Sequence, residues 1–223
     1  MKTIILVCIL QLMIVPLFGQ EERWTPSSKD ERKKDVRVEQ TDDKESKGGV
    51  VSKVKSFFSK KDTDSGDNEE RNAEAKTYYE KGEKAYKDEL YELAIEYFET
   101  CVSLNPKHDL AHYWMGESYY DLKEHKKAIA CYKQALKYNP DDHMAYFSIG
   151  SCYYQLDDSK AGIEFLQKAI ALNPGHKHSH NLMGHCYYDL KNYKKALLCY
   201  QKALEIDPDD ATARKGLESC RRR

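Results

Sequence analysis

From Ala75 onward, the chain repeats one pattern of small residues and prolines at intervals of 34 residues. Glycines keep this spacing at positions 82, 116, 150 and 184, and prolines keep it at positions 106, 140, 174 and 208. A small residue follows each glycine after twelve positions, and another comes seven positions later. A fixed period of about 20–50 residues is the signature of stacked repeats, in which each unit buries its apolar face only against its neighbours. The period therefore predicts a stack of four similar units between Ala75 and Asp210.

Each unit is expected to hold two helices. In the first unit we expect one helix over residues 75–88 and a second over residues 91–104. The proline that follows the second helix cannot continue a helix interior, and Asp109 can cap the helix that comes next. Gly82 lets the two helices approach closely, and Phe98 of the second helix fills the space beside it.

The order glycine, alanine, alanine, proline at this period resembles the tetratricopeptide repeat family. The resemblance implies an all-α fold, a right-handed α-solenoid. Its four helix-turn-helix repeats and its C-terminal capping helix would be residues 75–108, 109–142, 143–176, 177–210 and 211–223. The ends of such a stack must be sealed, and Ala213, Leu217 and Cys220 offer an apolar face for that purpose. The fold alone does not determine an activity, because function belongs to sites.

In proteins similar to this one, the first helix of each repeat lines a concave groove that binds peptides. The second, fifth, ninth, twelfth and thirteenth residues of a repeat face that groove. Carried over to this sequence, the resemblance implies a set of aromatic, acidic and polar groove residues: Tyr79, Glu83, Tyr86, Tyr113, Glu117, Tyr120, Phe147, Tyr154, Asn181, His185 and Tyr188. The twelfth-position tyrosines also serve packing, whereas Tyr79, Tyr113 and Phe147 are expected to be exposed aromatic residues of the kind that bind partners. We therefore predict a non-enzymatic scaffold that binds a peptide segment of a partner protein.

Several other functions lack support in the sequence. The metalloprotease, P-loop, hydrolase and dinucleotide-binding motifs are all missing, so neither catalysis nor a cofactor is predicted. A formal net charge of -1 gives no case for a nucleic-acid partner. Members of the family that bind chaperones hold a C-terminal carboxylate with lysine, asparagine and arginine. Here those positions carry Tyr79, Glu83, Met144 and Ser148, so that clamp is missing.

A histidine cluster supports an alternative, a metal-handling protein. His176, His178 and His185 lie close together in the sequence, beside Cys186. Neutral imidazoles bind zinc, copper and nickel. However, two helical turns separate His178 from His185 by about 10 Å, so one ion would need a ligand from another element.

The first 19 residues have the order of an export signal, with Lys2, an apolar run over residues 4–18 and then Gly19. This run is shorter than the roughly 20 residues that span a bilayer, which favours cleavage and a periplasmic or secreted protein over a membrane anchor. Residues 20–73 are rich in charge, and we expect this arm to be largely disordered. Within it, residues 50–61 place valines and phenylalanines on one helical face and four lysines elsewhere, which supports another alternative, a membrane-surface tether.

Six cysteines follow the predicted cleavage site: Cys101, Cys131, Cys152, Cys186, Cys199 and Cys220. An even number in an exported protein permits disulfides. These residues recur at packing positions of successive repeats, however, so we expect free, buried thiols that act as small apolar side chains.

Overall fold

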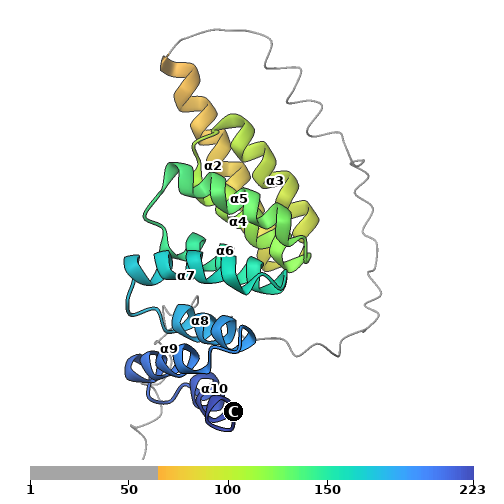
Figure 1. Ribbon diagram of the computed structural model, residues 1–223. Helices are drawn as coiled ribbons and strands as arrows, with labels where there is room; N and C mark the ends of the chain where they lie inside the picture. The colour runs from red at the N-terminus through yellow and green to blue at the C-terminus, as the bar shows by residue number, and fades with distance from the viewer. Residues whose placement is uncertain (1–64) are drawn as a thin grey trace, which may run out of the picture. The chain divides into compact units, whose positions relative to one another are not determined.

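The computed structural model describes residues 65–223 of the chain. The predicted signal peptide 1–19 and the amphipathic segment 50–61 lie outside the described residues. All nine elements of the described part are α-helices, and the fold is an all-α solenoid (Figure 1). In chain order the helices are α2 (Ser65–Lys87), α3 (Tyr91–Leu104), α4 (Asp109–Asp121), α5 (His125–Tyr138), α6 (His143–Gln155), α7 (Ser159–Leu172), α8 (Lys177–Asp189), α9 (Tyr193–Ile206) and α10 (Ala211–Arg221).

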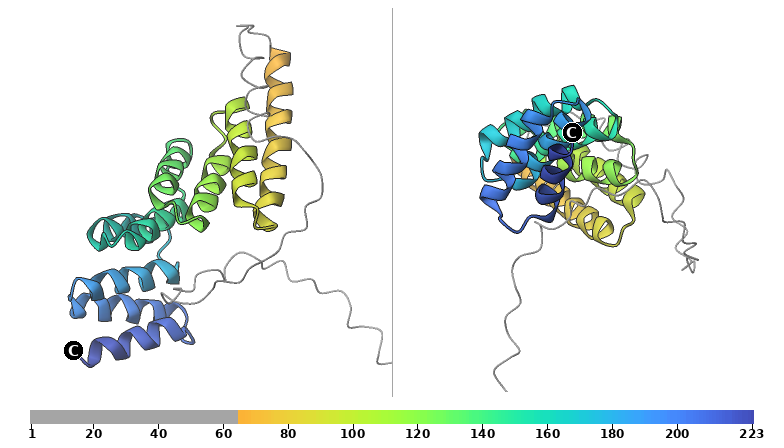
Figure 2. Two further views of the ribbon diagram at one scale, coloured as in Figure 1. Left: turned by 90° about the vertical axis from the view of Figure 1, so that its right-hand side faces the viewer. Right: turned by 60° about the horizontal axis from the view of Figure 1, so that its bottom comes forward.

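The helices pack as consecutive pairs. The most extensive contacts join α2 to α3, α4 to α5, α6 to α7 and α8 to α9, and each pair then stacks on the next (Figure 2). Neighbouring first helices also contact one another, as α2 does α4 and α4 does α6. Within residues 65–223, neighbouring second helices make no such contacts. The first helices therefore lie closer together and form the inner side of a curved stack.

Close contact within a pair depends on glycine. A Cβ atom added to Gly116 in α4 would lie 2.6 Å from Cε1 of Tyr132 in α5, well inside van der Waals distance. The same relation joins Gly82 to Phe98, and Gly184 to Tyr200. The sequence expectation that these glycines admit a large side chain of the second helix is confirmed.

Each turn between the two helices of a pair contains one residue in the left-handed backbone region. These residues are Glu89, Lys123, Asp157 and Lys191, with φ values between 59° and 63°. The turn closes with two backbone hydrogen bonds, and in the first pair Glu89 donates to Tyr86 and Leu90 donates to Ala85. A non-glycine residue costs about 1–2 kcal/mol in this conformation. The four turns therefore share one backbone geometry, and each contains one residue with a strained backbone.

The N-terminal boundary differs from the sequence expectation. Helix α2 begins at Ser65, so the disorder predicted for residues 20–73 is wrong over its last nine residues. The first turns of α2 carry acidic residues such as Glu69 and Glu70, which stabilise the positive end of a helix dipole. Helix α2 packs against α3.

Helix α10 closes the other end of the stack. Asp210 caps it by accepting a hydrogen bond from the backbone N–H of Ala213 at 3.0 Å. Ala213, Leu217 and Cys220 are buried against α9, as predicted for a capping helix. All six cysteines between Cys101 and Cys220 are buried and free. None of the helices between Ser65 and Arg223 combines the length and apolar character that crossing a bilayer requires.

Candidate binding face

We use the term A face for the inner surface formed by α2, α4, α6, α8 and α10. The predicted groove residues lie on its first four helices. Most of them are partly or fully buried, and the A-face residues with large exposed fractions are others, notably Leu110, Asp121, Gln155 and Asp189. Leu110 in α4 has 46% of its surface exposed, and several other leucines of the stack are exposed as well, among them Leu90 and Leu198.

In three of the four repeats, the fifth residue contacts the residue at the N-cap of the next first helix. The ring of Tyr79 stacks on His108 at 4.8 Å, and Phe147 packs edge-on against His176 at 5.0 Å. In the fourth repeat the contact is a hydrogen bond of 2.7 Å from Asn181 Nδ2 to Asp210 Oδ2. The fifth position thus connects adjacent repeats.

These contacts correct the expectation that Tyr79, Tyr113 and Phe147 are exposed aromatic residues. Phe147 is buried, with 8% of its surface exposed. Tyr79 and Tyr113 are partly buried, and burial together with a nearby glutamate raises the pKa of both phenols. Much of the ring surface of Tyr79 and Tyr113 therefore contacts other residues of the protein and not solvent.

Two of the twelfth-position tyrosines, Tyr86 and Tyr120, connect repeats through their hydroxyl groups. Tyr86 donates a hydrogen bond of 2.7 Å to Asp121 in the next repeat. Tyr120 shares one of 2.9 Å with Ser151, and Gln155 donates to the Tyr120 hydroxyl at 3.4 Å. The packing role expected for these tyrosines is therefore seen, and their rings line the A face as they perform it.

Glu117 lies at the centre of a polar network in the second repeat. Its Oε1 atom accepts hydrogen bonds from the Tyr132 hydroxyl at 2.7 Å and from the Ser148 hydroxyl at 2.9 Å. Burial raises the pKa of Glu117, although the hydroxyl donors act in the opposite direction by stabilising the carboxylate. In the first repeat, Glu83 accepts a comparable bond of 3.0 Å from Tyr79.

In the fourth repeat, the fifth and ninth positions carry an amide, Asn181, and an imidazole, His185. The Tyr200 hydroxyl and His185 Nδ1 lie 3.1 Å apart, and the ring of Tyr154 approaches His185 from the third repeat. Asn181 is almost completely buried, with 1% of its surface exposed. Its Oδ1 atom has no hydrogen-bond partner among the described residues.

The structure does not assemble the predicted metal ligands as a set. His176 and His178 have ring centroids 5.5 Å apart, but His185 lies apart and pairs with Tyr200. The third imidazole beside His176 belongs to His143, at 5.5 Å, which the sequence reasoning missed. His143 begins the third repeat, so the 34-residue period could have placed it beside the start of the fourth.

The histidine group does not have the geometry of a metal centre. Within residues 65–223, no three histidine, cysteine or acidic side chains are arranged to hold an ion. His143 Nε2 already pairs with the Asn173 amide at 3.0 Å, and His176 Nδ1 with the Ser179 hydroxyl at 2.7 Å. Burial and the neighbouring imidazoles lower the pKa of His176 to about 4, so it is neutral at pH 7.

Comparison with known families finds four matches along the stack. Models of the tetratricopeptide repeat match residues 79–133, 145–176 and 179–210, and a TPR repeat model matches residues 116–157. Comparison with curated proteins finds no significant match.

Several solved structures share the fold. The crystal structure of MamA protein is 24% identical with a TM-score of 0.63, over 66% of this chain and 81% of that one. YrrB, described as a TPR protein with an unusual peptide-binding site, is 20% identical with a TM-score of 0.58, over 64% and 74%. The first TPR of Spaghetti (RPAP3), bound to an HSP90 peptide, is 21% identical with a TM-score of 0.50, over 51% and 90%.

Proposed function

Because the chain belongs to the tetratricopeptide repeat family, we propose that it is a non-enzymatic scaffold that binds a peptide segment of a partner protein on the A face. The observation that carries this proposal is the exposed Leu110 among partly buried tyrosines. An exposed apolar side chain on the same helix as partly buried Tyr113 and Tyr120 offers contact area at low entropic cost. Two of the similar structures are described by their peptide or peptide-binding site, which agrees with this use of the fold.

The A-face residues divide into two roles under this proposal. Phe147 and Asn181 hold adjacent repeats together and set the shape of the surface. Leu110, Tyr120 and Tyr154 present the surface that a partner would contact, and of these Tyr120 also bonds to the third repeat. Substitutions should therefore target the second group, because changes in the first would disturb the stack.

A pair of matched leucine variants tests the proposal. Leu110→Gln changes the A face, whereas Leu198→Gln changes α9 at a leucine that is 61% exposed on a second helix. The protein, expressed from its complete sequence, serves as bait in extracts of its native cells, and circular dichroism checks that all baits are equally helical. We expect Leu110→Gln to lose a protein that the wild type and Leu198→Gln retain. Equal retention by all three baits would exclude the A face as the binding site.

We also propose that binding takes place after export, since residues 1–19 carry the features of a signal peptide. Cell fractionation tests this separately. Recovery of the protein only from the cytoplasm, with its first residues intact, would refute it.

A further inference from the structure

The A face of the second, third and fourth repeats contains no lysine or arginine at the five positions that define it. Those fifteen positions are Leu110, Tyr113, Glu117, Tyr120, Asp121, Met144, Phe147, Ser151, Tyr154, Gln155, His178, Asn181, His185, Tyr188 and Asp189. Three of them are carboxylates, and the helix caps Asp142 and Asp210 add two more at its edge. A chain with nearly equal numbers of basic and acidic residues thus has, apart from its histidines, only acidic charges at these fifteen positions.

Two of these carboxylates are stabilised by neutral donors. Glu117 accepts from the hydroxyls of Tyr132 and Ser148, and Asp210 accepts from the Asn181 amide and from a backbone N–H. Within the described residues, neither carboxylate forms an ion pair. Hydroxyl and amide donors satisfy hydrogen bonds but leave the net negative charge in place.

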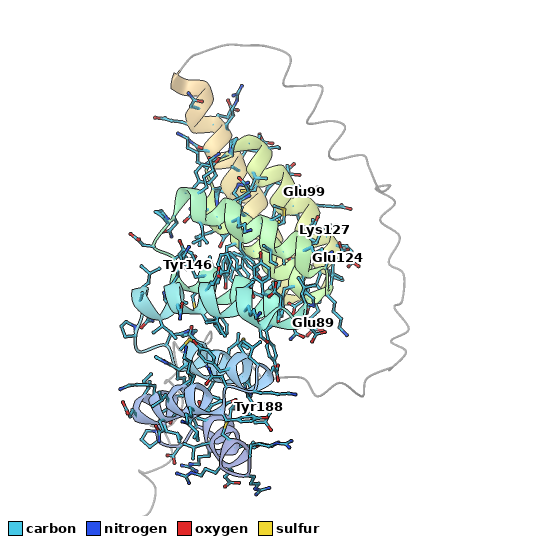
Figure 3. The ribbon with its side chains drawn as sticks, viewed as in Figure 1. Glu89, Glu99, Glu124, Lys127, Tyr146 and Tyr188 are labelled. Carbon is cyan, nitrogen blue, oxygen red and sulfur yellow. The ribbon has the colours of Figure 1, made fainter. Side chains whose placement is uncertain are left out.

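Ion pairs form elsewhere on the molecule. Lys127 pairs with Glu124 at the start of α5, where Glu99 of the neighbouring α3 lies close by (Figure 3). At the other end, Arg214 pairs with Asp209. Neither of these two ion pairs includes one of the fifteen positions, although Arg223 at the C-terminus contacts Tyr188 at the edge of the fourth repeat.

A second observation comes from Asn181. Its amide nitrogen donates to Asp210, which fixes the orientation of the amide and leaves Oδ1 as an acceptor without a donor. A buried acceptor without a donor has lost its hydrogen bonds to water, and this desolvation has a free-energy cost. An N–H group of a ligand would remove that cost, and an ammonium or guanidinium group would also neutralise Asp210.

The aromatic residues suit the same ligand. Tyr120 and Tyr154 are partly exposed on the A face. A cation over the face of an aromatic ring is attracted by the negative potential of that face. Exposed Leu110, near the start of α4, adds an apolar contact further along the same face.

We infer that the segment bound on the A face is basic, a peptide segment of a partner protein in which lysine or arginine alternates with apolar residues. Its cationic groups neutralise Glu117 in the second repeat and the Asn181–Asp210 pair at the end of the fourth. The inference rests on the proposed function and specifies the chemistry of the partner.

Three fluorescein-labelled peptides test the inference by fluorescence anisotropy. Each contains three copies of a four-residue unit, Ser-Lys-Phe-Lys in the basic peptide, Ser-Glu-Phe-Glu in the acidic one and Ser-Gln-Phe-Gln in the neutral one. The protein variants are Glu117→Gln and Asp210→Asn, which keep side-chain size and the ability to accept hydrogen bonds. Glu96→Gln is the matched control, because Glu96 is an exposed carboxylate on α3, away from the A face.

We expect the basic peptide to bind at least tenfold more tightly than its neutral and acidic twins. Glu117→Gln and Asp210→Asn should each weaken it by roughly tenfold, since a tenfold change corresponds to about 1.4 kcal/mol and one charge-assisted contact contributes about that much. Glu96→Gln should leave the affinity unchanged, and higher salt should weaken binding.

Equal binding of the three peptides, no binding of the basic one, or basic-peptide binding that both A-face variants leave unchanged would overturn the inference. Circular dichroism of each variant ensures that a loss of binding is not a loss of fold. The leucine-variant capture experiment has a separate readout. If Leu110→Gln loses its partner while the basic peptide fails to bind, the scaffold function stands and only the chemistry assigned to the partner is wrong.

Discussion

Gly116→Ala should destabilise the stack by about 2–4 kcal/mol, although alanine is the better helix former. The new Cβ would lie 2.6 and 2.8 Å from two ring carbons of Tyr132. The ring is fully buried, and its hydroxyl is held by Glu117, so it has little room to move. Overpacking costs about 1–3 kcal/mol. Displacing a hydroxyl from a charged acceptor adds about 1.5–3 kcal/mol, and the helix propensity of alanine returns about 1 kcal/mol.

Urea unfolding followed by circular dichroism at 222 nm measures this difference. Gly175→Ala is the control, because a Cβ there meets only Asn173 Oδ1, at an ordinary 3.5 Å. It should change the free energy of unfolding by less than about 1 kcal/mol. In a Tyr132→Phe background, Gly116→Ala should cost less, since the ring no longer has a hydroxyl bond to lose. If Gly116→Ala is as stable as the wild type, the ring moves freely and the packing argument is refuted.

Three further predictions concern the cap, the histidines and the cysteines. Asp210→Ala should lower stability by about 1–2 kcal/mol through loss of the α10 cap, with faster amide hydrogen exchange in α10, whereas Asp210→Asn should retain the cap. The His176 pKa of about 4 lies below its unfolded value of about 6.5, so the folded state binds fewer protons. The contribution of neutral His176 to the free energy of unfolding is therefore fully present above pH 6.5 and is lost as the pH falls. We expect a loss of roughly 1–2 kcal/mol from pH 6.5 to 5, smaller in His176→Gln, and an unchanged slope in that variant would contradict the assignment. Burial raises the pKa of thiols such as Cys101 and Cys186 to about 12, so the six buried cysteines should react with Ellman's reagent at pH 8 only after unfolding.

The sequence period was sufficient to predict the helix pairs, because glycine, alanine and proline mark the places where helices touch and end. The second helix of the first repeat was expected over residues 91–104, and α3 has these bounds. The extension of α2 to Ser65 was missed, because its charged residues resemble those of a disordered arm. Lys123 and its equivalents gave no sign of a left-handed turn, since that conformation usually requires glycine.

The binding face was harder to predict than the fold. A repeat position indicates which residues point inward but not which of them the next repeat covers. Phe147 occupies a groove position, yet His176 packs on it and excludes solvent. His143 joins His176 because consecutive repeats bring their first residues together, a relation that depends on the packing of two units and not on local sequence.

The pattern of helix contacts has a mechanical consequence. In the described part of the chain, each helix pair contacts only the pairs before and after it. Tension applied to the two ends of the stack would pass through every junction in series, because no long-range contact carries the load in parallel. Extension would therefore begin at the weakest junction and proceed one helix pair at a time, so the stack would lengthen in discrete steps.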